Sequence, residues 1–459
     1  MDINQIKAII EKNNIDNIKV GGTDIDGIWR GKRIPSKEFV EVTAKSGLKF
    51  CDVLFGWDIQ NEIYMEPHIP KYSGWHTGFP DLTAMPILDT FKIVPGEKNT
   101  ASVLCDYYHE KDHKQVELEI SPRAVLKRLI KKAGDMGFDV FSATELEFYL
   151  YDETTMSLCD KDFSNPRYLN PGISCYNIIR GTALEEVFGE MRRRIEAYGI
   201  ELEASNTEYG PGQFEVNVKY SECLEQADKS VLFKTMIKEI ATEKGLFATF
   251  MSKPYPIIAG NGLHVHQSLW YKDAKKNAFY DANAEHGASD VLRWFLGGLI
   301  STIHEFLPMY APTVNDYKRY VEDSYAPTNQ SWGHDNRTVA FRMIAEGPNS
   351  ARIENRSAGA AANLYLAKAA MLAAGLYGVE NKIEPDMAWY VKKGSGYDLG
   401  QTYPRSLAKA IPAMENSAIA KEYLGEWFVE HYLDTRKWEV YLFDRSVTEW
   451  ERIRYIEHV

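Results

Sequence analysis

Ionisable residues recur at every second position within strand-like stretches, and this spacing constrains the fold more than any other feature of the chain. The residues concerned are Glu145 and Glu147 in ATELEFYLYD, His264 and His266 in GLHVHQSL, and Arg352, Glu354 and Arg356 in SARIENRS. Residues two apart on a β-strand point to the same side of the sheet, so each stretch lays charged or metal-binding side chains along one face. In the first stretch the apolar Leu146 and Phe148 take the opposite face. We therefore expect strands that are buried on one side and carry chemistry on the other.

Two further carboxylates, Glu208 and Glu215, flank the Gly-Pro-Gly turn of TEYGPGQFEVNV. Five carboxylates and a histidine on converging strands are too many like charges for one dry face unless cations neutralise them. Oxygen ligands with one or two imidazoles suit Mg²⁺ or Mn²⁺ better than Zn²⁺. The residue types predict a site for two such cations.

Further arginines lie in NDYKRY and GHDNRTVAFR, namely Arg319, Arg337 and Arg342. Two cations beside several guanidinium groups form a site for phosphates, which favours phosphoryl transfer on an antiparallel sheet. The sequence contains neither a P-loop nor a G-x-G-x-x-G motif, and no nucleophile elbow. Because charged strand faces are commonly only solvated, the residue types alone leave the structural alternative open.

Composition narrows the class of protein further. The chain has 459 residues, a net charge of −12 and an odd number of cysteines, five, with no C-x-x-C pair. The charge argues against nucleic acid or an anionic membrane as a partner, and the cysteine pattern predicts a reducing, cytoplasmic location. The Ala-rich stretch Gly359 to Gly375 is interrupted by Asn363 and Lys368, so we expect a buried helix there and not a membrane span.

The order of patterns along the chain predicts two domains, residues 1–115 and residues 116–459. In the first we expect a hairpin within 20–35 and strands at 50–55 and 101–106. In the second we expect a strand at 138–151, two strand pieces within 202–218, and helices at 184–198, 231–247 and 291–306. Ser121 and Pro122 form the start signal of another helix. The fold class expected for the second domain is mixed, with strands and helices.

Taken together and in order, the segments ELEFYLYD, GPGQFE, GLHVHQSL, NDYKRY, DNRT and ARIENRSAGAAANLYLA resemble the glutamine synthetase family over nearly the whole chain. The resemblance implies an α+β fold. An N-terminal β-grasp domain would precede a catalytic domain with an antiparallel half-barrel and surrounding helices. It also implies a homo-oligomer, a dodecamer of two stacked hexameric rings, with active sites between neighbouring subunits.

The resemblance assigns roles to individual residues. The implied ligands of the first metal are Glu147, Glu208 and Glu215, and those of the second are Glu145, His264 and Glu354. The implied glutamate site consists of Arg319, Arg356 and Gly260. The residues implied to bind ATP are Glu203, Tyr220, His266, Ser268, Arg342 and Arg352, and the implied catalytic residues are Arg337, Asp58 and Tyr325.

The implied reaction has two steps and uses ATP as co-substrate with two or more Mg²⁺ or Mn²⁺ ions. The γ-carboxylate of L-glutamate attacks the γ-phosphate of ATP to form γ-glutamyl phosphate. A small amine or ammonia then displaces phosphate and leaves a γ-glutamylamide.

Departures from the family pattern gather where the amine would bind. Tyr325 stands where ammonia-using members carry a glutamate, and Asp58 is the nearest counterpart of a second ammonium-binding carboxylate, with Asp52 a weaker one. A less anionic, more aromatic site suits an amine with a carbon substituent. Within the family the chain therefore resembles the amine-ligase branch, to which γ-glutamylmethylamide synthetase belongs, and this resemblance implies a short alkylamine such as methylamine as substrate. Tyr397, in GSGYDLG, is interpreted as a surface tyrosine.

Two alternatives remain open from the sequence. Tyr325 could be a tolerated replacement in an ammonia-dependent glutamine synthetase, with Asp58 supplying the missing charge. A structural or regulatory ring protein could have kept the fold and lost catalysis. Retention of every implied metal ligand argues against the last alternative, because a silent site has no reason to keep buried charge.

Overall fold

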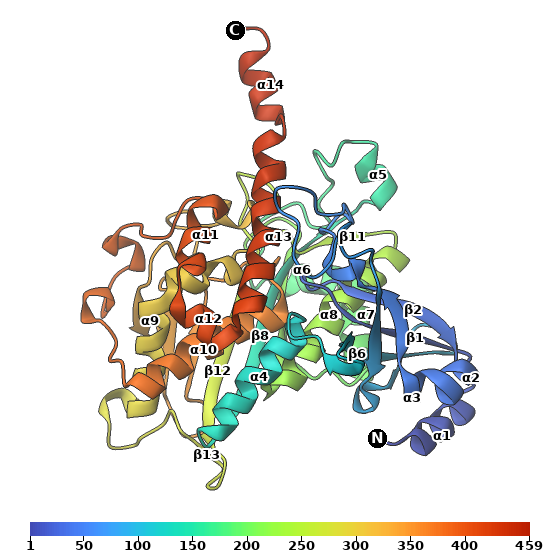
Figure 1. Cartoon of the computed structure of the whole chain (residues 1–459). Helices are drawn as coiled ribbons and strands as arrows, with labels where there is room; N and C mark the ends of the chain where they lie inside the picture. Colours follow the sequence, from blue (N-terminus) through green and yellow to red (C-terminus); the bar gives the residue numbers. More distant parts are fainter.

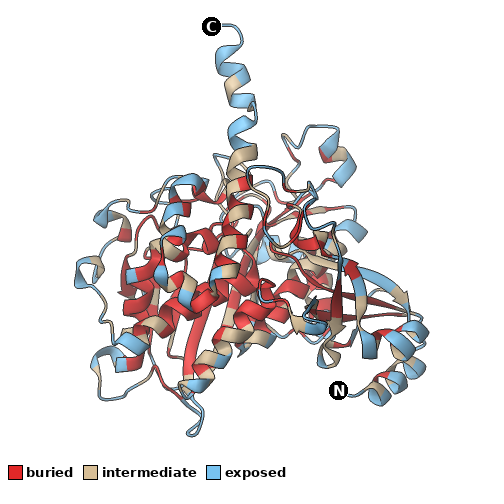
Figure 2. Ribbon diagram, in the orientation of Figure 1, coloured by how far each residue is buried: buried red, intermediate tan, exposed pale blue.

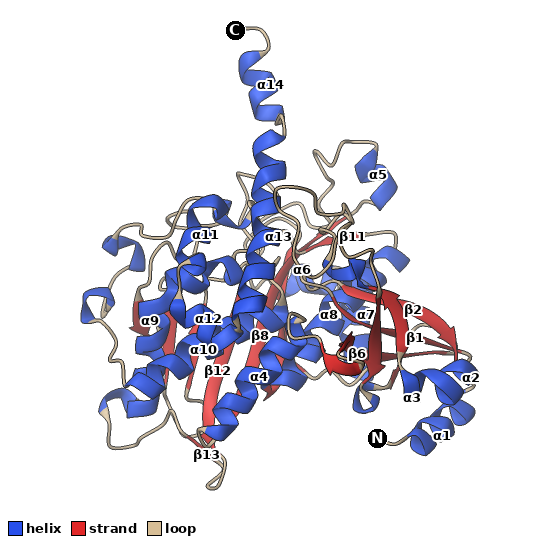
Figure 3. Ribbon diagram, viewed as in Figure 1, coloured by secondary structure: helices blue, strands red, loops and turns tan.

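A computed structural model describes all residues from Met1 to Val459 and shows two β-sheets with helices packed around them (Figures 1 and 3). The first sheet has the strand order β2-β1-β6-β4-β3, with β5 and β7 paired to β6. Its strands are β1 Asn17–Thr23, β2 Trp29–Pro35, β3 Leu48–Cys51, β4 Asp81–Pro86, β5 Lys92–Ile93, β6 Thr100–Lys111 and β7 Lys114–Glu117. The β1–β2 pair is the antiparallel hairpin expected within 20–35, whereas β1 and β6 run parallel.

The second sheet is the larger one and has the order β14-β15-β16-β12-β8-β10-β9, with β11 on β8 and β13 on β12. Its strands are β8 Phe138–Tyr151, β9 Leu202–Thr207, β10 Gln213–Glu222, β11 Phe247–Thr249, β12 Leu263–Tyr271, β13 Lys276–Asn277, β14 Trp332–His334, β15 Phe341–Ile344 and β16 Arg352–Asn355. Every pair in this sheet is antiparallel except β14–β15. The expected antiparallel catalytic sheet is confirmed.

Helices accompany both sheets. Those of the first part are α1 Ile3–Asn13, α2 Ser36–Glu38 and α3 Ala44–Ser46. Those that follow are α4 Pro122–Asp135, α5 Thr155–Cys159, α6 Ile178–Ala183, α7 Glu185–Ala197, α8 Cys223–Glu243, α9 Asp290–Tyr310, α10 Leu364–Asn381, α11 Leu407–Glu415, α12 Ala418–Leu424, α13 Glu426–Arg445 and α14 Glu449–Tyr455. The start of α4 follows its sequence signal, because the Ser121 side chain accepts a hydrogen bond from the Ala124 backbone N–H and Pro122 occupies the first turn.

Two hydrophobic cores underlie the two sheets (Figure 2). The smaller core, of 17 buried residues, lies under the first sheet, and the larger one, of 86, joins the second sheet to α4 and α8–α13. At the centre of the larger core α9 and α10 pack at glycines, since a Cβ on Gly298 would lie only 2.1 Å from the Ala374 carbonyl oxygen. The Ala-rich stretch is thus a buried helix, as expected, and no helix of the chain is long and apolar enough to cross a membrane.

The structure departs from the expected strand at 50–55. Strand β3 ends at Cys51, and residues Asp52–Phe55 form a 3₁₀ turn instead. Asp52 is buried there and accepts a hydrogen bond from the Ser73 hydroxyl, a long-range contact that an apolar run does not reveal. The first sheet ends with β7 and α4 opens the second part at Pro122; the division at residue 115 stays a prediction.

Candidate active site

Strand β8 lies in the middle of the second sheet and sets the geometry of the site. Its interior residues alternate between buried and partly exposed along the strand, so that Leu146 and Phe148 face the core while Glu145 and Glu147 face the opposite side. The antiparallel register places His264 of β12 beside Glu145 and Glu215 of β10 beside Glu147. The period-two spacing in the sequence therefore becomes a row of carboxylates and imidazoles across neighbouring strands.

Three carboxylates, Glu147, Glu208 and Glu215, form the first acidic cluster, with oxygens within 4.8 Å of one another. Burial and the charge of Glu147 raise the pKa of Glu208 to about 7 and that of Glu215 to about 9. Shifts of this sign mean that the three side chains cannot all ionise at neutral pH without a compensating cation. The donor set fits Mg²⁺ or Mn²⁺, which prefer carboxylate oxygens.

The second cluster surrounds Glu145 and mixes carboxylates with imidazoles. The His264 Nδ1 lies 3.0 Å from Glu145 Oε2 and 3.5 Å from Glu354 Oε1, and the His266 Nε2 lies 3.1 Å from Glu145 Oε1. Glu145 groups with His266 and Glu354 on one side and with Glu215 and His264 on the other. The expected set Glu145, His264 and Glu354 is therefore together, and His266 joins it as a possible ligand.

Glu354 is fully buried and is balanced by arginines. The Arg356 Nη1 donates to Glu354 Oε1, and the Arg342 Nη1 donates to Glu354 Oε2 at 2.9 Å. Although burial opposes ionisation, the Arg356 guanidinium lowers the pKa of Glu354 to about 2. Glu354 thus stays anionic at neutral pH, as a metal ligand requires.

The remaining arginines line the same cavity. Arg319 is buried, and its guanidinium donates to the backbone carbonyls of Arg356 and Ser357. Gly260 packs against it so closely that a Cβ at this position would lie 2.9 Å from the Arg319 Cγ. Arg337 lines the cavity from the turn after β14. The cavity therefore presents several guanidinium groups, close to the acidic clusters, that can bind an anionic substrate.

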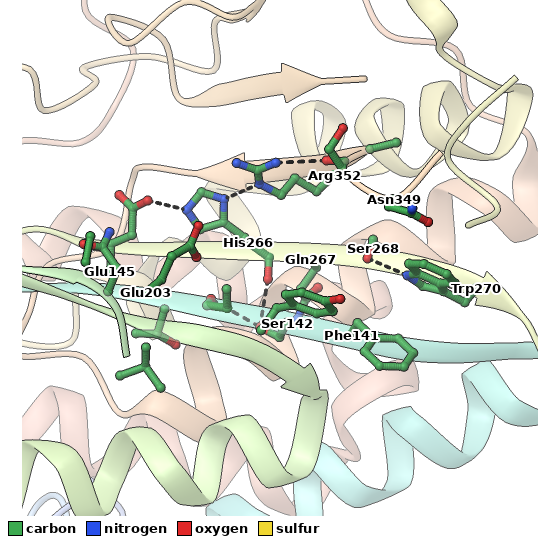
Figure 4. A pocket seen from close by; sticks show the side chains of 18 residues that line it. Phe141, Ser142, Glu145, Glu203, His266, Gln267, Ser268, Trp270, Asn349 and Arg352 are labelled. Atoms are coloured by element: carbon green, nitrogen blue, oxygen red, sulfur yellow. Dashed lines mark hydrogen bonds and ion pairs between the residues drawn. The ribbon is translucent and has the colours of Figure 1, made fainter. Parts of the chain in front are cut away.

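A second hollow adjoins the first and shares Glu145, Ala204 and Asn217 with it. Figure 4 shows Glu145, Glu203, His266 and Arg352 at one end and Phe141 and Trp270 at the other. The Arg352 Nε donates to His266 Nδ1 at 3.2 Å, and the Phe141 and Trp270 rings lie 5.4 Å apart. A charged end beside the acidic clusters and an aromatic far end match the two halves of a nucleoside triphosphate.

The structure gathers nearly all of the residues singled out from the sequence around these two hollows. The residues lining the first are Glu145, Glu147, Glu208, Glu215, Gly260, His264, Arg319, Tyr325, Arg337, Arg342, Glu354 and Arg356. Those lining the second are Glu145, Glu203, Tyr220, His266, Ser268 and Arg352. Sequence reasoning missed Phe141, Trp270 and Asn349. The alternation along β8 and β12 could have revealed the two aromatic residues, because they lie on the same faces as Glu145 and His266.

Asp58 is the exception. It lies in the first part of the chain, is buried, and lines neither hollow. Its Oδ1 accepts hydrogen bonds from the backbone N–H groups of Gln60 and Glu62, and its Oδ2 accepts one from the Trp438 indole at 3.0 Å. In this chain Asp58 organises a loop against α13, and any role at an active site stays a prediction.

Comparisons of the sequence and of the structure with known proteins agree on one family. Residues 119–455 match the family model described as "Glutamine synthetase, catalytic domain". The chain is 41% identical to type-1 glutamine synthetase 2 of Dictyostelium discoideum over 460 residues, covering 99% of this chain and 85% of that protein. It is 38% identical to a glutamate–isopropylamine ligase of Pseudomonas sp, covering 99% and 97%. The structure of apo GmaS superposes with a TM-score of 0.82 at 27% identity, covering 98% of this chain and 99% of that one.

Proposed function

The chain belongs to the glutamine synthetase family, and we propose that its second substrate is a short alkylamine in preference to ammonia. As a member of the family it is an ATP-dependent ligase that joins the γ-carboxylate of glutamate to an amine or to ammonia. The product of the proposed reaction is a γ-N-alkylglutamine, with ADP and phosphate released.

One observation carries the choice of amine. Every carboxylate that lines the first hollow, hereafter the catalytic hollow, belongs to one of the acidic clusters, namely Glu145, Glu147, Glu208, Glu215 and Glu354. Once these side chains bind cations, none is left over to hold an ammonium ion. The binding of a fully solvated small cation such as NH₄⁺ needs such a charge, whereas an alkylamine gains from contact with apolar or aromatic surface.

The catalytic hollow contains aromatic side chains that can make such contacts with an alkylamine. Tyr325, Tyr176 and Tyr209 all line the catalytic hollow and are more than half exposed at its rim. Their rings offer apolar faces to an alkyl group and negative quadrupoles to an alkylammonium ion. Two relatives point the same way, because the Pseudomonas protein is named for isopropylamine and a 31% identical Streptomyces coelicolor protein for γ-glutamylethanolamide.

The proposed roles of the residues follow from their places in the cavity. Arg319, with Gly260 against its stem, and Arg356 hold the glutamate carboxylates. Arg337, Arg342 and Arg352 face the phosphates, and Phe141 and Trp270 take the base of ATP. Divalent cations, held by the two acidic clusters, supply the positive charge that lets a carboxylate approach a triphosphate.

We also propose that the enzyme works as a homo-oligomer, a dodecamer of two stacked hexamers. Ile173, Ile178 and Ile179, which flank Cys175 and Tyr176 of the catalytic hollow in the chain, are all largely exposed, and exposed apolar side chains are typical of protein interfaces. In Figure 1, the C-terminal end of α13 and the whole of α14 extend beyond the globular body, and the apolar side chains of Val447, Trp450, Ile453 and Ile456 are exposed along this extension.

The test compares amines directly. Phosphate release and amide formation are measured with ATP, Mg²⁺ and glutamate, using ammonia, methylamine, ethylamine, isopropylamine and ethanolamine in turn. We expect kcat/KM for one substituted amine to exceed that for ammonia by more than about tenfold, roughly 1.4 kcal/mol of transition-state preference. If ammonia is the best substrate, the second candidate, an ammonia-dependent glutamine synthetase, is correct; the Dictyostelium relative favours that candidate.

A further inference from the structure

The loop of residues 394–400 lies outside both hollows, yet it is hydrogen-bonded to the two segments that carry Tyr325 and Arg337 into the catalytic hollow. We propose that this loop is a brace, and that Tyr397 is the positioning residue through which it holds the Tyr325 segment over the amine site. The inference rests on the proposed function, because it assigns a role in amine use.

The Tyr325 segment needs an external support. Asp323 and Tyr325 both have a φ of 59°, in the left-handed region that residues other than glycine rarely adopt. Such a backbone persists only where its surroundings hold it. Tyr325 itself is 62% exposed, so its own ring is not held by packing.

The Ser324 hydroxyl bonds carbonyls within the same stretch, and Tyr397 adds a support from a separate loop. Its hydroxyl donates a hydrogen bond to the Ala326 carbonyl oxygen at 3.1 Å, directly after Tyr325. The side chain is half-buried, and burial raises the pKa of its phenol, so the hydroxyl keeps its proton at neutral pH. Tyr397, expected to be a surface tyrosine, is only partly exposed and its hydroxyl is hydrogen-bonded.

The other side of the brace holds the turn that carries Arg337. The Gly396 N–H donates to Thr338 Oγ1 at 2.9 Å, and the Asn336 side-chain amide donates to the Gly394 carbonyl at 3.3 Å. The contact is close, because a Cβ on Gly396 would lie 2.5 Å from the Thr338 carbonyl oxygen. Arg337 thus lies between two residues that the brace holds.

The brace is itself anchored to the body of the protein. The buried Asn329 side-chain amide donates to the carbonyls of Gly396 at 2.8 Å and Gly400 at 2.6 Å. Ser395 caps the short 3₁₀ turn of residues Gly396–Leu399. A fixed loop that bonds both Ala326 and Thr338 sets the separation of Tyr325 from Arg337, and hence of the amine from the phosphoryl group.

Loosening this brace has a specific chemical consequence. A displaced Tyr325 no longer orders the amine, and water can attack γ-glutamyl phosphate in its place. Attack by water returns glutamate and releases phosphate, so ATP is consumed without amide formation. The second hollow, which we propose binds ATP, contains no residue of the brace and is expected to be unchanged.

The experiment uses Tyr397→Phe, which removes only the hydroxyl, with Tyr271→Phe as the matched control. Tyr271 is an exposed residue of β12 whose hydroxyl has no hydrogen-bond partner in the chain. For Tyr397→Phe we expect the KM for the amine to rise about three- to tenfold, the scale of one neutral hydrogen bond. We also expect fewer amides per phosphate released, with the KM for ATP and the melting temperature unchanged. Amide hydrogen exchange of residues 321–328 should become faster.

Thr338→Val tests the other end of the brace. In the double variant with Tyr397→Phe, we expect a loss smaller than the product of the two single losses, because both break the same support. Unchanged amide-to-phosphate ratio, unchanged exchange at 321–328, or multiplicative losses would each overturn the inference. A wild-type enzyme that is active only with ammonia overturns the proposed function instead, and the exchange measurement, which needs no amine, still decides whether the brace exists.

Discussion

Replacing Glu215 with glutamine should stabilise the enzyme when no divalent cation is present. Glu215 lies in the first acidic cluster, where burial and the neighbouring Glu147 raise its pKa from 4.5 to about 9. At pH 7 the folded protein keeps this carboxyl protonated while the unfolded chain ionises it. At about 1.4 kcal/mol per pH unit between 4.5 and pH 7, this difference costs the folded state about 3.5 kcal/mol. A neutral amide of the same shape removes the cost.

The sign of the pH dependence is fixed by the direction of the shift. Because the folded state binds the proton more tightly, the cost is absent below pH 4.5, grows as pH rises, and levels off above about pH 9. Water in the open cavity screens part of the interaction, so we expect Glu215→Gln to gain about 1–3 kcal/mol at pH 7 and more at pH 8 than at pH 6.

The assay is thermal unfolding followed by circular dichroism in EDTA at pH 6, 7 and 8, repeated with saturating Mn²⁺. Wild type should gain more from Mn²⁺ than Glu215→Gln does, because the variant lacks an anionic ligand. Glu222→Gln, at the exposed end of the same strand, is the matched control and should change neither curve. A metal-free Glu215→Gln protein that is no more stable than wild type at pH 8 would refute the reasoning.

Three other predictions follow from the site and the surface. Tyr325→Glu should raise the ratio of kcat/KM for ammonia to that for methylamine by about tenfold, by restoring a carboxylate for ammonium; an unchanged ratio in the amine assay contradicts this. Arg319→Lys should raise the KM for glutamate about tenfold or more by losing the planar guanidinium fork, with little change in the KM for ATP; equal changes in both would argue against a glutamate clamp. A chain ending at Arg445 should form an assembly of fewer subunits than the full chain, as measured by light scattering, because it lacks the exposed apolar side chains from Val447 onward; an unchanged number of subunits would show that they do not contribute to assembly.

The strands that carry the site could be predicted from the sequence because their signal is local. Strand β8 has the bounds expected from its pattern, Phe138–Tyr151, since alternation over a long run has no competing interpretation. The same alternation gave the face on which Glu145 and Glu147 lie. The pairing of His264 with Glu145 then follows from the antiparallel register.

Features that depend on distant contacts could not be predicted. Asp58 is predicted from the sequence to be an ammonium-binding carboxylate, and nothing near it in the sequence reveals that its Oδ2 accepts a hydrogen bond from Trp438, 380 residues further along the chain. Tyr397 is interpreted from the sequence as a surface tyrosine, because its hydrogen bond to Ala326 spans 71 residues and leaves no local signal. Local patterns report which face a side chain takes, but they do not report which partner from another element meets it there.

The acidic clusters and the two hollows of the site share individual side chains. Glu145 belongs to both groupings of the second cluster and lines both hollows, so it connects the nucleotide half with the glutamate half. Glu354 accepts hydrogen bonds from Arg342 and Arg356, the first proposed to face phosphate and the second glutamate. A cation bound at Glu354 would compete for the same oxygens and make both guanidinium groups more available to anionic substrates. We therefore expect cation binding at Glu354 to change how strongly Arg342 and Arg356 bind their anionic substrates.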